Sequence, residues 1–252
     1  GDTLAIIDIS GAYIPFTEDT RANNARTNTP ENVAELFNNR RINSSYGCAY
    51  YPWIVIKDSL NSNSLVAVPS SVAAVGVFAQ SQRQSNIWFA PAGFNRGGLK
   101  NLGGPTGPKV FGVVQRVDKD GRDKLYQVNI NPIAKFPSEG IVIFGQKTLQ
   151  ATESALDRIN VRRLLIYLKK EVSRMSTQVL FDNNVPATWS RFTSMVNPFL
   201  ASVQSRFGLT DYKVILDETT TTPDLIDRNI LYAKIYLKPA RSIEFIALDF
   251  II

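Results

Sequence analysis

A glycine-rich stretch, residues 95–109, is the first place where chemistry could be expected, because glycine-rich loops can cradle phosphate groups. It reads NRGGLKNLGGPTGPK and holds five of the chain's 15 glycines. A nucleotide-binding P-loop ends in Gly-Lys-Ser/Thr, since the lysine reaches the outer phosphates and the hydroxyl binds magnesium. Here Lys109 lies between Pro108 and Val110, and no Gly-x-Gly-x-x-Gly fingerprint occurs. We therefore expect a mobile surface loop and no cofactor.

Two sets of carboxylates could bind a metal or act as an acid or base. The stretch DKDGRD begins at Asp118, but its Gly121 comes fourth, whereas a calcium-binding EF-hand loop places glycine sixth and glutamate twelfth. We interpret Asp120-Gly121 as a hairpin turn. Asp8 follows a short apolar run and could serve a hydrolase. No partner base or metal cluster can be named for it, so a turn or helix-capping role is favoured.

Residues that are missing narrow the chemistry further. The 252-residue chain has no histidine and one cysteine, Cys48. Without histidine, Ser-His-Asp and Cys-His catalysis and the usual zinc sites are excluded. One cysteine excludes an internal disulfide framework and fits a reducing compartment. The composition predicts no catalytic and no metal-binding residues. Because the chain begins with glycine, we expect it to be part of a longer or processed protein.

A net charge of +6 leaves a nucleic-acid-binding module open as an alternative. In that hypothesis Arg162 and Arg163 would contact phosphates, and Tyr50, Tyr51 and Trp53 could stack on bases. The positive charges are scattered, however, and the aromatic residues alternate with apolar ones. A mildly basic surface and aromatic core packing are therefore favoured. Residues 59–82 lack charge but contain asparagine, proline and serine, so they do not predict a membrane span.

Helical and extended patterns alternate along the first part of the chain. Strands are predicted over 3–10, 48–58 and 140–149, with Pro52 marking a bend or an edge. Asp120-Gly121 predicts an antiparallel hairpin between 110–117 and 124–130. Helices are predicted to begin at Pro30, capped by Thr29, and after Pro69. The residues expected to face inward in these two helices are Val33, Leu36, Phe37, Val72, Val75 and Ala79.

The last hundred residues have clearer patterns. Apolar residues recur with helical spacing over 161–175 and over 189–207, the second helix opening at Pro186 and ending before Gly208. Strands are predicted over 177–182, 211–217, 231–240 and 242–252, with a short helical turn at 223–228. These patterns predict an α/β protein whose mixed β-sheet is flanked by helices.

Six blocks resemble, in order and spacing, the contractile tail sheath proteins of large tailed, myovirus-type bacteriophages. They are YYPWIVIKD, VPSSVAAVGVFAQSQRQSNIWFAPAG, NINPI, VIFGQKTL, INVRRLLIYLKKEV and IYLKPARSIEFIALDF. The resemblance implies a subtilisin-like portion without a catalytic triad over 1–152, incomplete at its N-terminus, and a C-terminal α/β sheath domain over 153–252. It also implies a structural, non-enzymatic protein of the virion tail.

The resemblance further implies partners. Sheath subunits assemble in the host bacterial cytoplasm as a helical tube around the inner tail tube, between baseplate and tail terminator proteins, without nucleic acid or membrane insertion. Contraction by rigid-body subunit rearrangement drives the tube through the host envelope during genome delivery. A sheath subunit of a related contractile injection machine, such as a bacteriocin or secretion system, is the alternative within this class.

Terminal arms that add strands to neighbouring subunits are another implication of the resemblance. The apolar C-terminal strands 231–238 and 242–251 are therefore expected near an inter-subunit contact. Without such arms we expect the chain to be monomeric. The candidate contact residues are Leu231, Tyr232, Ile235, Tyr236, Phe245, Ile246, Phe250 and Ile252.

Overall fold

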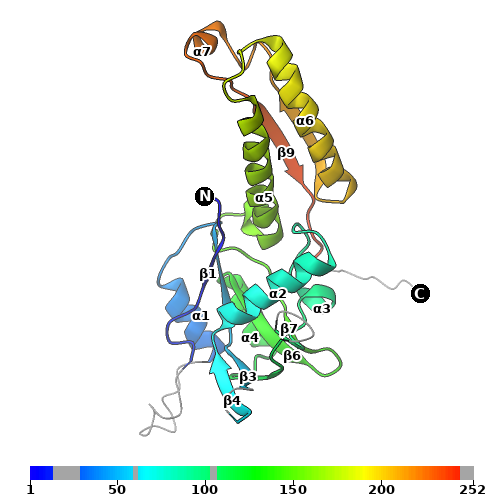
Figure 1. Ribbon diagram of the computed structural model, residues 1–252. Helices are drawn as coiled ribbons and strands as arrows, with labels where there is room; N and C mark the ends of the chain where they lie inside the picture. The colour runs from blue at the N-terminus through cyan, green and yellow to red at the C-terminus, as the bar shows by residue number, and fades with distance from the viewer. Residues whose placement is uncertain (14–28, 59–61, 103–106, 245–252) are drawn as a thin grey trace, which may run out of the picture. The chain divides into compact units, whose positions relative to one another are not determined.

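The computed structural model describes residues 1–13, 29–58, 62–102 and 107–244 (Figure 1). The chain divides into two compact units, and each is described by itself. Unit 1 comprises essentially Thr3–Arg163, and unit 2 follows from Leu164. The division falls inside helix α5 (Ile159–Ser176). Both units combine helices with strands, as predicted.

A four-stranded mixed sheet lies at the centre of unit 1. Its order is β1-β2-β6-β7, with β1 (Ala5–Ile7), β2 (Gly47–Tyr51) and β6 (Ile130–Phe136) parallel and β7 (Gly140–Ile143) antiparallel to β6. All of β2 and the first five residues of β6 are buried. Such continuous burial is typical of parallel strands that are covered on both faces.

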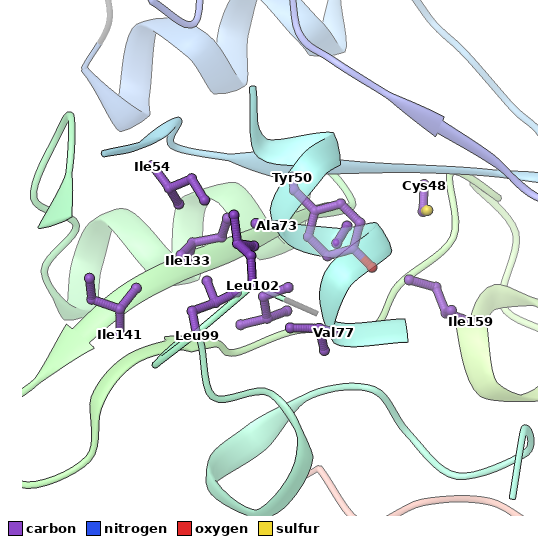
Figure 2. Packing of buried hydrophobic residues seen from close by; sticks show 12 residues of the cluster. Cys48, Tyr50, Ile54, Ala73, Val77, Leu99, Leu102, Ile133, Ile141 and Ile159 are labelled. Carbon is purple, nitrogen blue, oxygen red and sulfur yellow. The ribbon is translucent and has the colours of Figure 1, made fainter. Parts of the chain in front are cut away.

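Side chains of β2 alternate between two hydrophobic clusters. Cys48 and Tyr50 belong to the cluster that includes Ala73 and Val77 of α2 (Ser70–Gln84), and Figure 2 shows Tyr50 beside the α2 side chains with Cys48 to one side. Ala49 and Tyr51 belong to the other cluster. That cluster contains side chains of α1 (Pro30–Asn38) and α4 (Lys119–Gln127). The period-2 alternation of the strand thus places the sheet between two helical layers.

The single strand predicted over 48–58 is in fact two strands in different sheets. Pairing of β2 stops at Tyr51, before a cis Tyr51–Pro52 bond, and β3 (Ile54–Asp58) starts after it. Strand β3 is the middle of an antiparallel sheet, between β4 (Ser64–Val68) and β5 (Val110–Val113). Proline lacks the N–H that a ladder needs, so the predicted bend at Pro52 is confirmed but the continuous strand is wrong.

Helix α2 buries the opposite face from the one predicted. Val72 and Val75 are 43% and 57% exposed, whereas Ala73 and Ala74 are fully buried. The small alanine side chains allow the helix to pack closely on the sheet. The close packing stabilises this arrangement more than burial of the larger valine side chains would. In α1 the Thr29 cap and the inward Val33 and Phe37 are confirmed, but Leu36 is largely exposed.

The hairpin predicted around Asp120-Gly121 is wrong. The Asp118 side chain accepts a hydrogen bond from the Gly121 N–H at 2.8 Å and caps helix α4. A side chain added at Gly121 would lie 3.2 Å from Pro30, so α4 packs closely on the start of α1. The dipeptide thus occupies a helical first turn, where capping by Asp118 replaces the turn.

The glycine-rich stretch is partly structural, and a surface loop is wrong for its described beginning. Leu99 and Leu102 are buried in the cluster of Figure 2. The Leu99 N–H bonds to the Ile141 carbonyl at 2.8 Å, and the Ile143 N–H bonds to the Gly97 carbonyl at 2.8 Å. A Cβ at Gly97 would lie 2.6 Å from the Ile143 oxygen, so glycine is required for this approach to β7.

Unit 2 combines two long helices with a two-stranded antiparallel sheet. Helix α6 (Pro186–Ser205) buries Trp189, Phe192 and Val196, as its pattern predicted. Strands β8 (Leu209–Ile215) and β9 (Lys234–Pro239) pair with each other, and α7 (Pro223–Asp227) lies between them in sequence (Figure 1).

Two predictions for unit 2 need correction. The strand expected over 177–182 is wrong, because Thr177–Val179 forms a 3-10 turn and Phe181 has a positive φ of 69°. Phe207, expected on the buried stripe of α6, lies beyond the helix end, is 76% exposed and has φ 62°. Both residues follow the ends of helical segments and adopt the positive φ that glycine usually supplies there. A phenylalanine is not expected from its residue type to take this role.

Candidate inter-subunit surface

The carboxylate considered for catalysis, Asp8, caps a helix. It follows β1 and accepts hydrogen bonds from the Ser71 N–H at 2.9 Å and the Ser71 hydroxyl at 2.6 Å. Ser71 lies in the first turn of α2, whose N-cap position is Pro69, a residue without a capping side chain. A carboxylate at a helix N-terminus satisfies free N–H groups and favours the helix dipole. The capping role favoured from the sequence is therefore confirmed.

The basic pair that would contact nucleic acid is buried. Arg162 and Arg163 are only 6% and 7% exposed. The Arg162 guanidinium donates to the Ser45 hydroxyl and lies 4.0 Å above the Tyr46 ring. Arg163 lies 4.7 Å above the Phe78 ring, and burial lowers its pKa. Contacts with phosphates through this pair are excluded by its burial, and the two cations act in packing instead.

The aromatic residues considered for base stacking are mostly core residues. Tyr50 and Tyr51 are fully buried, and burial raises the pKa of both phenols. Trp53 stacks on Tyr13 with ring centroids 4.8 Å apart. Burial also raises the pKa of the Cys48 thiol to about 12, which makes a thiolate nucleophile unavailable at neutral pH. Core packing, favoured from the sequence, is confirmed for both tyrosines.

Metal-binding clusters and membrane-spanning helices are both missing from the described residues. Within those parts of the chain, no three Cys, Asp or Glu side chains gather as a metal site would require. None of the helices over the described residues is long and apolar enough to cross a membrane.

The β8–β9 pair of unit 2 leaves both of its outer edges open within the described residues. Each strand has one neighbour, in contrast to β2, which has two. The side chains of one face lie toward the helices, since the Tyr212 hydroxyl donates to the Asn197 carbonyl of α6 at 3.2 Å. Open edges carry unpaired N–H and C=O groups that can pair with another chain.

The structure places four of the predicted contact residues on or beside β9. Tyr232 and Tyr236 are 49% and 55% exposed, and Tyr232 is anchored through its backbone to the Thr221 hydroxyl at 3.2 Å. Leu231 and Ile235 are half-buried, and Ile235 pairs with Val214. The strand begins at Lys234, three residues later than predicted. The remaining predicted contact residues lie outside the described residues: Phe245, Ile246, Phe250 and Ile252.

Sequence reasoning did not anticipate the lysines beside these tyrosines. Lys213, Lys234 and Lys238 are exposed on β8 and β9. Strand β9 alternates exposed charged or aromatic residues with half-buried apolar ones along its whole length, and β8 alternates exposed and half-buried residues over 211–214. That period-2 signal is visible in the amino-acid sequence and could have identified the outward face.

Comparison with known proteins identifies relatives over most of the chain. Residues 151–252 match the phage tail sheath C-terminal domain. The chain is 36% identical over 223 residues to the tail sheath protein of Vibrio phage KVP40, covering 88% of this chain and 32% of that protein. It is 37% identical over 184 residues to the tail sheath protein of Enterobacteria phage T4, covering 73% of this chain and 27% of that protein.

A solved structure of a contractile sheath has a similar fold. The chain superposes with a TM-score of 0.74 and 25% identity on the PVC sheath complex of an extracellular contractile injection system in the contracted state. That match covers 88% of this chain and 60% of the other. The chain spans about a third of the length of the curated relatives it matches. The matched domain, the identity to two tail sheath proteins and the shared fold agree: the chain belongs to the family of phage tail sheath proteins.

Proposed function

We propose that the chain is part of a structural subunit of a contractile phage tail sheath. The subunits polymerise as a helical tube around the inner tail tube and contract to drive that tube through the host envelope during genome delivery. The observation that carries the proposal is 36% identity over 88% of the chain to a tail sheath protein. The fold shared with a sheath complex in the contracted state supports it.

The physical requirements of this function fit a protein without catalysis. Identical subunits joined by heterologous contacts form a helix when the rotation between them does not close. Contraction then needs stable blocks that move as rigid bodies. The driving free energy is stored during assembly as a kinetically trapped state, so no nucleotide is needed. A helix-capping Asp8 and a buried Cys48 agree with a non-enzymatic role.

A finer domain description is part of the proposal. Residues 1–152 form a subtilisin-like portion without a catalytic triad, and residues 153–252 form the sheath C-terminal domain. The parallel strands β1, β2 and β6 with helices on both faces are compatible with the first assignment. The match of residues 151–252 to the sheath C-terminal domain supports the second.

The proposed inter-subunit contact lies along the open strands at the C-terminal end of the chain. Tyr232 and Tyr236 are exposed enough to be covered by a neighbour, and the free edge of β9 can accept an added strand. Leu231 and Ile235 would support that edge from the half-buried side. Phe245, Ile246, Phe250 and Ile252 complete the proposed contact.

The proposed partners are further copies of the subunit, the inner tail tube protein, and the baseplate and tail terminator proteins. The proposed location is the virion tail, after assembly in the host bacterial cytoplasm. A bacteriocin or secretion-system sheath is the second candidate, because injection-system structures share the fold. The identity to the phage proteins, 36% and 37%, exceeds the 25% to the injection-system sheath and favours the phage tail.

Electron microscopy tests the proposal. The protein, in the longest form in which it is produced, is mixed with inner tube and baseplate proteins and imaged. Hollow striated tubes around the inner tube are the expected result. Isolated particles under every condition, with the inner tube and baseplate present, would contradict it.

A further inference from the structure

The outward face of the β8–β9 pair is basic. Side chains directly opposite each other in an antiparallel pair project to the same face. Lys213 is opposite Tyr236, Asp211 is opposite Lys238, and Ile215 is opposite Lys234. We name the exposed members of this face, Asp211, Lys213, Lys234, Tyr236 and Lys238, the lysine face.

The three lysines form no ion pair with any described residue. The ion pairs of the described residues involve other side chains, and Lys234 only approaches the Tyr232 ring, at 5.9 Å. The carboxylate on the same face, Asp211, accepts a hydrogen bond from the Tyr212 N–H at 2.8 Å. The lysine face therefore presents three cations and one carboxylate, with an exposed phenol among them.

An acidic segment of opposite character follows β8. Residues 217–227 carry Asp217, Glu218, Asp224 and Asp227, all exposed, and no basic residue. The Asp217 carboxylate is occupied by Thr219, whose N–H and hydroxyl donate to it at 2.9 and 2.5 Å. These bonds hold the Asp217 side chain in place at the start of the segment. The carboxylates of Glu218, Asp224 and Asp227 are exposed. Asp224 approaches Arg228 only at 3.9 Å.

The two surfaces cannot fully neutralise each other within one copy. The acidic segment leaves the sheet after Ile215, whereas Lys238 lies opposite Asp211 at the other end of β8. Four residues of strand separate these ends by roughly 13 Å, at about 3.3 Å per residue. Within one copy the acidic segment thus lies near one end of the lysine face, where hydrogen bonds and, to a smaller extent, the charge of Lys213 lower the pKa of Asp217. The other end, at Lys238, is left for an acidic segment from another chain.

We propose that the lysine face of one copy docks the acidic segment of a second copy. The inference rests on the proposed sheath function, which requires contacts between copies. Two different surfaces meet in this contact, so it is heterologous and propagates as an open helix when the rotation does not close. Complementary charges fix the register of such a contact and suppress wrong pairings. The contact is distinct from strand addition at the edge of β9.

Cross-linking with a carbodiimide tests the contact, because this reagent joins a lysine amine and a carboxylate that touch. The chain is prepared in equal parts with natural and heavy nitrogen, so that cross-linked peptides of mixed label arise only between copies. Mixed-label links from Lys213, Lys234 or Lys238 to Glu218, Asp224 or Asp227 are expected, with a yield that falls as salt screens exposed charges. Mixed-label links only between other residues would overturn the inference.

Charge-reversal variants sharpen the test. Changing the three lysines to glutamate, or the three carboxylates to lysine, is expected to lower the fraction of protein assembled into tubes at least about fivefold, since like charges then face each other. Tube formation is the readout for these variants, because each single reversal also removes one of the two groups that the carbodiimide joins. Carrying both sets of changes in one chain is expected to restore it. The control changes Lys100, Lys109 and Lys135 to glutamate, which alters the net charge equally at exposed positions of unit 1. An equal loss in the control would overturn the inference.

Three further outcomes are distinguishable. Tubes that form equally well with wild-type and lysine-reversed protein would overturn the inference and leave the sheath function standing. Absence of any assembly, in every variant and with inner tube present, would instead contradict the function. Steeply salt-dependent binding of single-stranded DNA that is lost on lysine reversal, without mixed-label links, would make nucleic acid the partner and overturn the inference.

Discussion

Strands β6 and β9 belong to the same chain but to sheets of opposite character. Strand β6 has a neighbour on each side, and its first five residues are buried. Within the described residues, β9 has one neighbour, and its residues alternate between exposed and half-buried along its whole length. The central strands of the unit 1 sheet are therefore covered by neighbouring strands and by helices, whereas the sheet of unit 2 has open edges and an exposed face in the described part of the chain.

The polar side chains of β6 and β9 also differ in burial. In β6 the fully buried Asn131 amide donates to the carbonyls of Ala49 and Lys147, at 3.1 and 2.8 Å, and accepts from the Lys147 N–H at 2.6 Å. In β9 the polar side chains Lys234, Tyr236 and Lys238 lie in solvent. The buried polar side chain of β6 is thus paired within the chain, while the polar side chains of β9 are exposed.

The largest expected effect compares the same substitution in both strands. Ile133→Ala in β6 should lower the free energy of unfolding by about 4 kcal/mol, because a fully buried side chain leaves a cavity. Ile235→Ala in β9 should cost about 1.5 kcal/mol, since its half-buried site exchanges part of that contact for water. Denaturant unfolding of the two variants measures the difference. Equal losses would break the contrast between the sheets.

Alkaline pH should weaken unit 1 selectively. Burial raises the pKa of the Cys48 thiol from 9.0 to about 12, and that of Tyr50 also rises. The folded state therefore keeps protons that the unfolded chain releases, so this stability is complete below pH 9 and is lost as pH approaches 12. In Cys48→Ala the fall of unfolding free energy between these limits should be less steep, by about 1 kcal/mol per pH unit.

Denaturant titrations at several pH values measure these slopes. The absolute stability of Cys48→Ala is not the readout, because removing the thiol changes packing as well. Val77→Ala, at a buried position in the same cluster as Cys48, serves as the control: it changes packing without removing a titratable group and should leave the slope unchanged. A Cys48→Ala slope identical to that of the wild type would show that the thiol does not contribute.

Long amphipathic segments of the fold could be predicted from sequence, and local exceptions could not. Helices α5 and α6 were identified because their apolar stripes extend over several turns. Helix α4 was missed because Asp120-Gly121 fits two structures, and only the Asp118 cap and the approach to Pro30 decide between them. The approach to Pro30 is a long-range contact and is invisible in a local pattern, whereas the Asp118 cap lies only three residues before Gly121 and could have been recognised from the sequence.

The candidate inter-subunit surface also has features that could be predicted from the sequence and features that could not. The exposure of Tyr232 and Tyr236 agrees with a place near a contact, but the direction of each β9 side chain depends on its pairing with β8. The prediction from the sequence therefore identified the segment, whereas its outward face could have been identified only from the period-2 alternation of β9. The prediction of the buried face of α2 was wrong for a related reason. Ala73 is buried and Val72 is exposed because of where the sheet lies beneath the helix, which the local sequence does not encode.

The capping role of Asp8 predicts a smaller effect. Asp8→Ala should destabilise unit 1 by about 1 to 2 kcal/mol, because the Ser71 N–H and hydroxyl lose their acceptor at the start of α2. Asp8→Asn should cost about half as much, since the amide oxygen can still accept one bond. Thermal unfolding of both variants measures this, with Ser10→Ala at an exposed neighbouring position as control. No loss in Asp8→Ala would reject the capping role.

The smallest effect on folding is expected at Tyr236, and it separates a folding role from a contact role. The side chain is 55% exposed, so Tyr236→Ser should change the unfolding free energy by less than about 0.5 kcal/mol. The same change at Tyr50, fully buried in β2, should cost about 4 kcal/mol. Tube formation by Tyr236→Ser protein is nevertheless expected to fall, because a tyrosine at the centre of a covered surface contributes to binding. A variant that folds normally and assembles poorly places Tyr236 against a partner, whereas unchanged assembly would mean that this face remains in solvent.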